Sequence, residues 1–163
     1  MTITRDKSNL RFEHSFIVNT CIDYVWNFYT DIMHLERITP SQMHLKILST
    51  TSSELHAGTL VTLSGTFLFI KKTWKSQITY SQKYKYVDEM INGPFPHWRH
   101  THIFVKLDNH KTIIKDEIDF KLPFYLQGRI ISCYMIRSLK RIFDFRKNQT
   151  IAFLMEKKDE NNI

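Results

Sequence analysis

The first forty residues carry a strand pattern followed by two short helical patterns. Hydrophobic and polar residues alternate from Arg11 to Val18, which is the period-2 pattern of a strand with one buried face. Hydrophobic residues then recur at helical spacing up to Tyr29, with Thr20 as the candidate N-cap. A second short helix begins near Asp31 and must end before Pro40, because the residue preceding a proline avoids the helical region.

The middle of the chain is almost continuously strand-like, and turn residues such as Ser52-Ser53 and Asp108-Asn109 divide it. Six further strands are predicted within Met43–Ile47, Val61–Phe69, Trp74–Tyr80, Tyr84–Ile91, Trp98–Leu107 and Thr112–Phe120. Their order along the chain is that of an antiparallel meander.

After Pro123 the pattern becomes that of one long helix, with apolar residues on one face from Ile131 to Phe153. Together these elements predict an α+β fold in which a curved antiparallel sheet of seven strands wraps around the final helix. A helix cannot fill such a curve, so we expect a cavity between sheet and helix, where small ligands commonly bind.

Length and composition narrow the class of protein. A chain of 163 residues fits one domain, predicted over 1–163 with flexible polar tails at 1–9 and 156–163. Its four glycines cannot form a G-x-G-x-x-G turn or a P-loop, which excludes these two kinds of nucleotide site. The net charge of +7 favours anionic partners in general, but the basic residues are spread along the chain, so no specific nucleic-acid binding is predicted.

The sequence predicts a cytoplasmic protein without a cofactor. The N-terminus lacks the apolar segment of a secretory signal, and no apolar stretch is long enough to predict a transmembrane segment. Cys21 and Cys133 lack the spacing of a metal or redox motif and are predicted to be free thiols. Neither has the sequence context of a nucleophile, and no G-x-S-x-G motif is present.

Asp116 is the clearest candidate for a functional side chain, because it shares the apolar side of its strand with Ile114, Ile118 and Phe120. A buried carboxylate needs a partner, since burying it alone costs more free energy than packing returns. His102, across a turn near Asn109, is one such partner if its side chain faces the same way.

Periodicity does not decide which side chains of the strand with His100 and His102 face the core. Either His100 and His102 or the alternate residues such as Thr101 and Ile103 face inward, and Asp88 on the strand before could join the histidines. Two histidines and a carboxylate formally match a common metal-ligand set. Because the i, i+2 spacing occurs in any strand histidine pair, no metal site is predicted.

Motifs from about Phe12 to Phe153 resemble the SRPBCC, or START/Bet v1-like, superfamily, and within it a bacterial cyclase/dehydrase-like branch that is also found fused to epimerase domains. The most specific block is Gly93-Pro94-Phe95, Trp98, His100-Thr101-His102 and Phe104. The other matching motifs are Thr39-Pro40, Gly58-Thr59, Trp74-x-x-x-Ile78, Tyr86-Val87-Asp88-Glu89, Asp116-x-Ile118-x-Phe120-x-x-Pro123 and Phe143-x-Phe145-Arg146.

The resemblance implies a helix-grip fold with a deep cavity, and it favours the inward direction for Trp98, His100, His102 and Phe104. Members of the superfamily bind lipids, polyketides, hormones or other hydrophobic molecules, and only some are enzymes. We therefore predict binding of a small hydrophobic, amphipathic or lipid-like ligand. The predicted lining is Trp74, Ile78, Tyr86, Trp98, Phe104, Ile118, Phe120 and Phe143, with Asp88, His100, His102 and Asp116 as its polar minority.

Two alternatives remain open. One is an aromatase/cyclase-type enzyme in which His100 or His102 moves protons and is oriented by Asp116 or Asp88. The other, weaker alternative is an interaction or membrane-surface module that uses the basic helix face around Arg137, Lys140 and Arg141.

Overall fold

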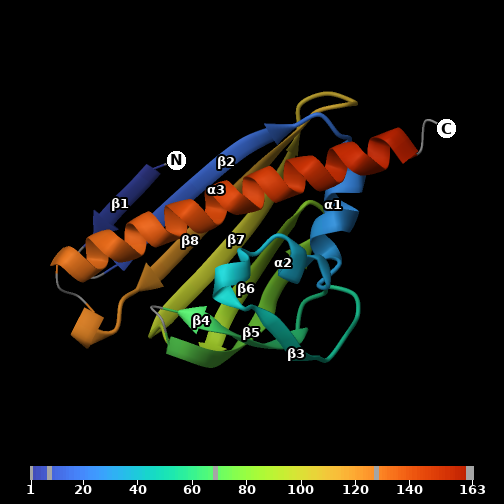
Figure 1. Ribbon diagram of the computed structural model, residues 1–163. Coiled ribbons are helices and arrows are strands. Elements are labelled where there is room, and N and C mark those ends of the chain that lie inside the picture. Colours follow the sequence, from blue (N-terminus) through green and yellow to red (C-terminus); the bar gives the residue numbers. More distant parts are fainter. Residues whose placement is uncertain (1, 7–8, 68–69, 127–128, 161–163) are drawn as a thin grey trace.

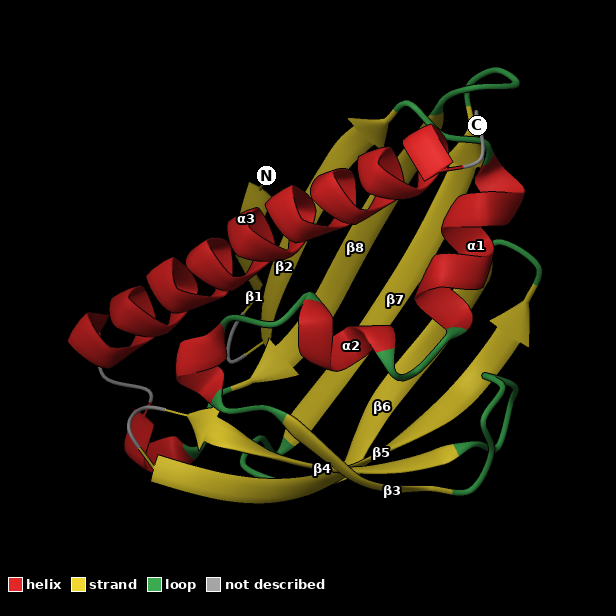
Figure 2. Cartoon of the chain, turned by 45° about the vertical axis from the view of Figure 1, so that its right-hand side comes forward, coloured by secondary structure: helices red, strands yellow, loops and turns green. Residues whose placement is uncertain are grey.

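The computed structural model describes residues 2–6, 9–67, 70–126 and 129–160, and it shows a long helix lying across the concave face of a curved sheet (Figures 1 and 2). The strands are β1 (Thr2–Asp6), β2 (Asn9–Val18), β3 (Lys46–Thr50), β4 (Leu60–Phe67), β5 (Ile70–Gln82), β6 (Lys85–Asn92), β7 (His97–Lys106) and β8 (Thr112–Lys121). The helices are α1 (Ile22–Thr30), α2 (His34–Arg37) and α3 (Arg129–Glu160), with 3-10 turns η1 (Ser41–Met43) and η2 (Phe124–Leu126).

The sheet is antiparallel, and its strand order is β1-β2-β8-β7-β6-β5-β4-β3. Strands β3 to β8 form the predicted meander, and β2 pairs with β8 beside it. The helix α3 spans 32 residues. The predicted α+β helix-grip fold, with seven strands around a long C-terminal helix and short helices after the first predicted strand, is confirmed.

The chain differs from the prediction at both ends. Residues 2–6, predicted as part of a tail, form an additional edge strand, with Thr2 opposite Glu13 and Asp6 opposite Asn9. An edge strand pairs through its backbone, so a polar segment with little hydrophobic alternation can occupy this position. At the other end α3 continues to Glu160, so 156–160 is helical, and 161–163 lie outside the described residues.

Helix α1 starts one residue later than a Thr20 cap would give. Its N-cap is Cys21, whose side chain makes no capping hydrogen bond. The carbonyl of Thr20 instead accepts a hydrogen bond from Thr112 Oγ1 at 2.8 Å, which ties the start of α1 to β8. Cys21 and Cys133 are exposed free thiols.

The core has two main apolar clusters at the two ends of the concave face. One joins α1 to the sheet around Phe16, Val25 and Ile114. The other joins α3 to the sheet around Phe12 and Phe120. On β8 the inward residues of both clusters follow one alternation, in which every second side chain from Thr112 to Phe120 is buried. Asp116 is one of these buried residues and lies between the two clusters.

No helix in the described part of the chain has the length and apolar character needed to cross a membrane.

We expect Phe120→Ala to lower the free energy of unfolding by about 3–5 kcal/mol, because the ring is fully buried and its loss leaves a cavity. Ile17→Ala, at a strand position that is 54% exposed, should change it by less than about 0.5 kcal/mol. Urea denaturation of both variants measures the two values. Similar losses in the two variants would contradict the assignment of Phe120 to the core.

Candidate functional site

Two neighbouring cavities lie between the concave face of the sheet and the helices. The first, of about 100 Å³, is bounded by α1, α2 and strands β4 to β7. The second, of about 170 Å³, is bounded by η1, strands β4 to β7 and the middle of α3. Both are lined by Leu35, Leu63, Ser76, Asp88, His100 and Arg146. The cavities therefore meet at a polar junction, which consists of Asp88, His100, His102 and Arg146 with Asp116 behind them.

Strand register brings the polar side chains of the sheet together. Asp88 on β6 is paired with His100 on β7, and His102 on β7 is paired with Asp116 on β8. The two pairs occupy adjacent rows of one face because inward side chains are two residues apart along a strand. The inward direction of His100 and His102 is thereby established.

Each imidazole lies between the two carboxylates. Asp116 Oδ1 is 3.0 Å from His100 Nε2, with which it shares a hydrogen bond, and 3.1 Å from His102 Nδ1. On the other side of the rings, Asp88 Oδ2 is 3.6 Å from His100 Nδ1 and 3.4 Å from His102 Nε2. The two rings lie over one another with centroids 3.7 Å apart.

The two histidines have opposite electrostatic environments. Burial, together with the neighbouring charge of His102, lowers the pKa of His100 to about 4. Burial also opposes protonation of His102, but Asp116 and Asp88 outweigh it and raise the pKa of His102. The junction therefore favours the neutral form of His100 and the protonated form of His102.

Both carboxylates are held in the ionised form. Burial alone would raise their pKa values, but hydrogen bonds and charge contacts with the histidines lower the pKa of Asp116 well below its usual range. The pKa of Asp88 is lowered in the same way, with His102 as its strongest stabilising partner. Arg146 adds a positive charge that acts in the same direction on Asp88.

Arg146 is the residue that the sequence prediction missed. It comes from α3 and lines both cavities, its guanidinium lies 5.4 Å from the ring of Phe143, and its Nε is buried without a hydrogen-bond partner among the described residues. Its only signal in the sequence was its place at the end of the Phe143-x-Phe145-Arg146 motif. A guanidinium with a buried free donor can bind an anionic or carbonyl oxygen.

His14 is a second buried polar residue near the junction that the sequence prediction did not include. It lies on β2 directly opposite Asp116, so Asp116 has a histidine on each neighbouring strand. Burial lowers the pKa of His14, and its Nε2 is 3.8 Å from Asp144 on α3. In the alternation from Arg11 to Val18, His14 falls on the same side as Phe12 and Phe16.

The predicted lining residues fall into three groups. At the first cavity are Ile78, Tyr86, Asp88, His100 and His102. At the second are Trp74, Asp88, Trp98, His100 and Phe143. Asp116 is buried behind the histidines, and Phe104, Ile118 and Phe120 pack in the apolar clusters. Contact of any of these residues with a ligand stays a prediction.

The Gly93-Pro94-Phe95 turn forms part of the wall of the second cavity. A Cβ added at Gly93 would lie 2.7 Å from Trp74 Cβ and would collide with the side chain of Met90, so no larger residue fits without movement. This close approach places Pro94 and Phe95 at the cavity. The turn therefore positions an aromatic wall and makes glycine necessary at this point.

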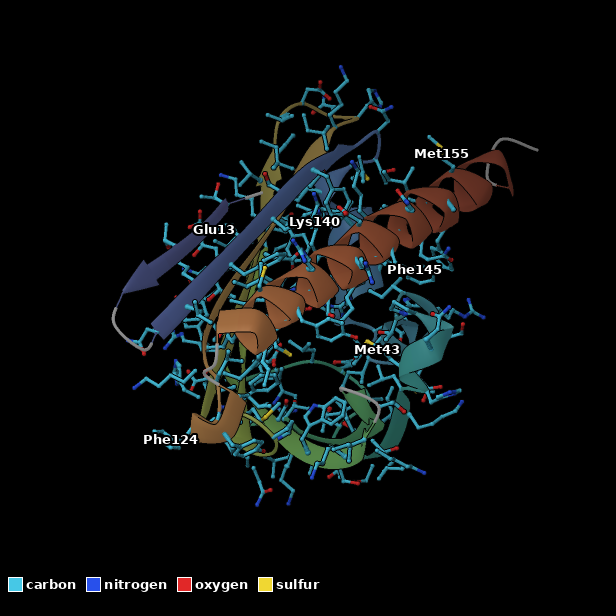
Figure 3. The ribbon with its side chains drawn as sticks, turned by 60° about the vertical axis from the view of Figure 1, so that its left-hand side comes forward. Glu13, Met43, Phe124, Lys140, Phe145 and Met155 are labelled. Atoms are coloured by element: carbon cyan, nitrogen blue, oxygen red, sulfur yellow. The ribbon has the colours of Figure 1, made fainter. Side chains whose placement is uncertain are left out.

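The predicted basic face of α3 points away from the cavities. Arg137, Lys140 and Arg141 are exposed, whereas Met135 and Leu139 on the opposite face are buried. Figure 3 labels Lys140 on α3 and Phe124, which is 90% exposed, on η2. None of these residues contributes to the polar junction.

The junction supports three kinds of chemistry. A neutral and a protonated imidazole can take and give a proton. Arg146 can bind an anionic or carbonyl oxygen through its free Nε. Asp88, His100 and His102 also offer donor atoms that lie within 4.8 Å of one another, which is close enough to hold a metal ion.

Comparison with known families gives one match over most of the chain. Residues 20–132 match the family described as polyketide cyclase / dehydrase and lipid transport. No curated protein matches the sequence.

Several solved structures have the same fold. The protein TTHA0849 from Thermus thermophilus superimposes with a TM-score of 0.67 at 12% identity, covering 87% of this chain and 97% of that chain. The ZhuI aromatase/cyclase from Streptomyces sp. R1128 gives 0.65 at 16% identity, covering 95% and 96%. A nucleoside-diphosphate sugar epimerase from Corynebacterium glutamicum gives 0.64 at 20% identity, covering 88% of this chain and 29% of that chain.

The lowered pKa of His100 predicts that acid destabilises the fold. An unfolded histidine titrates near pH 6.5, whereas folded His100 takes up a proton only near its pKa of about 4, so the unfolded state binds more protons in between. The free energy of unfolding should fall by about 3 kcal/mol from this effect as the pH is lowered through that window. The raised pKa of His102 acts in the opposite sense, but above pH 6.5, where stability is lost as the pH rises.

Urea denaturation at several pH values between 4 and 7 measures this slope. The control is His100→Gln, which keeps a donor toward Asp116 but does not titrate, and which leaves His14 in place. The variant should have a smaller slope than the unmodified protein. Equal slopes in the two proteins would show that His100 does not carry the effect.

Proposed function

Because the chain belongs to the polyketide cyclase / dehydrase and lipid transport family, we propose that it binds a small hydrophobic or amphipathic molecule between the sheet and α3. The family match confirms the SRPBCC resemblance that the motifs predicted. The observation that carries the proposal is the meeting of two largely apolar cavities at one buried polar junction. Such a site suits a ligand with apolar ends and a polar group between them.

The walls of the cavities support this kind of ligand. The first cavity has aliphatic and aromatic residues such as Ile32, Ile38 and Phe28, and the second has Trp74 and Trp98. Arg146 has the donor available to an anionic or carbonyl oxygen at the junction, because both ring nitrogens of His102 face carboxylates. A ligand group that satisfies the free Nε of Arg146 would remove the cost of a buried unpaired donor.

The second candidate function is an aromatase/cyclase-type reaction in the same cavities. The observation that favours it is that the pKa values of the two histidines are shifted in opposite directions. The neutral form is favoured for His100, which can accept a proton, and the protonated form is favoured for His102, which can donate one. A structural neighbour of this chain is an aromatase/cyclase. Asp116 would orient both rings, and the cavity walls would hold a flexible substrate in a reactive shape.

We place this function in the cytoplasm. The exposed free thiols of Cys21 and Cys133 fit a reducing compartment.

Filling the junction should abolish ligand binding. Ser76 is buried and lines both cavities, so Ser76→Phe would place a ring where they meet. We expect the fluorescent amphipathic anion 1-anilinonaphthalene-8-sulfonate to bind the unmodified protein and to bind this variant at least tenfold more weakly. The matched control is Thr73→Phe, an exposed position of the same strand, which should bind the probe normally. Equal binding by all three proteins would place the probe outside the cavities and contradict the proposal.

Molecules extracted from freshly purified protein separate the two candidate functions. Native mass spectrometry and solvent extraction would be carried out on the unmodified protein and on His102→Gln. A binding protein should yield the same molecule from both, in smaller amount from the variant. An enzyme should instead accumulate a precursor in the variant, for example one that differs from the product by the elements of water. Extraction of no small molecule from either protein would count against both functions.

A further inference from the structure

We propose that Asp88, His100 and His102 form a binding site for a divalent metal ion of the zinc type, and that Asp116 positions the two histidines from behind. The i, i+2 spacing in the sequence predicts no such site. The inference comes from distances between strands β6, β7 and β8, which the sequence does not contain.

The first argument is the spacing of the donor atoms. Asp88 Oδ2 is 3.4 Å from His102 Nε2 and 3.6 Å from His100 Nδ1. One donor atom from each of the three residues lies within 4.8 Å of the other two. A tetrahedral ion with bonds of about 2.0–2.1 Å separates its donors by about 3.4 Å. The two distances to Asp88 are longer than those of good hydrogen bonds and match this separation.

The second argument is the direction of the two rings. The nitrogens near Asp88 are Nδ1 of His100 and Nε2 of His102, while the opposite nitrogens lie 3.0 and 3.1 Å from Asp116 Oδ1. Metal-bound histidines usually donate their second N–H group to a carboxylate, which fixes the ring orientation. The buried Asp116 Oδ1 shares a hydrogen bond with His100 and makes an ion-pair contact with His102, so one oxygen faces both candidate ligands.

The third argument is access and charge. Asp88 and His100 line both cavities and His102 lines the first, so an ion bound there would have a fourth position open to the cavity. Arg146 also lines both cavities, and its positive charge opposes a second cation. The negative charges of Asp88 and Asp116 nevertheless equal the charge of a divalent ion when both imidazoles are neutral.

The proposed metal site is independent of the identity of any organic ligand. A cavity that binds a hydrophobic molecule without metal would leave the proposed function intact, and a metal site without such a ligand would leave this inference intact. The two ideas can therefore fail separately.

The test is zinc binding by protein purified without a histidine tag and dialysed against a chelator. Isothermal titration with Zn²⁺ near neutral pH should show one site per chain, and Co²⁺ should give the intense visible absorption of a tetrahedral centre. Asp88→Asn should weaken Zn²⁺ binding at least tenfold. The matched control is His97→Gln, which removes an exposed histidine of the same strand, β7, that is outside the donor set and should bind Zn²⁺ normally.

Asp116→Asn tests the positioning role. We expect Zn²⁺ affinity to fall 10–100-fold, as is typical for loss of a carboxylate that supports ligand histidines, and the Co²⁺ absorption to shift because the rings lose their fixed orientation. Circular dichroism would establish which variants fold. The Zn²⁺ titration of the unmodified protein does not depend on whether the variants fold, and the absence of a stoichiometric Zn²⁺ site would overturn the proposal. Zn²⁺ affinity that is unchanged in a folded Asp88→Asn variant would also overturn it.

Discussion

The buried charge of Asp116 is the constraint on which the concave face depends. A carboxylate removed from water is strongly destabilising unless opposite charge and hydrogen bonds surround it. Its neighbours on the same face of β8 are apolar, so its partners come from β7, where His100 shares a hydrogen bond with it and His102 lies opposite it. Together with His14, which lies opposite Asp116 on β2, these side chains form a polar row across the sheet. This polar row separates the two apolar clusters of the core. The helix therefore packs on the sheet at either side of the row, and the cavities lie beside it.

Helix α3 places two different side chains, Phe143 and Arg146, against this polar row. The ring centroid of Phe143 lies 5.6 Å from that of His100 and 5.8 Å from that of His14, so Phe143 packs against both imidazoles. Arg146, nearly one turn further along, places its charge at the junction of the cavities. One face of the helix thus closes the core and provides the positive group that two ionised carboxylates favour.

Much of the fold could be predicted because alternation, turn residues and the long helical pattern are local properties of the sequence. Asp116 was identified for the same reason, since its own strand has an unambiguous apolar side. The strand with His100 and His102 has large or apolar residues on both sides, and its direction is decided by pairing with β8 rather than by its own pattern. Arg146 could not be distinguished from the other basic residues of α3, because only tertiary packing separates an arginine at a cavity from one on the surface.

The two carboxylates of the junction have different roles because they differ in access. The side chain of Asp116 is 5% exposed and lies behind the histidines, whereas that of Asp88 is 22% exposed and faces both cavities. The Asp116 side orients the rings whether the opposite side holds a proton, a ligand atom or a metal ion. The proposed ligand atom, proton or metal ion would therefore be held on the Asp88 side, where the ring nitrogens meet the cavity. A substitution at Asp88 can change what is bound while the fold is retained, but a substitution at Asp116 alters the supporting arrangement itself.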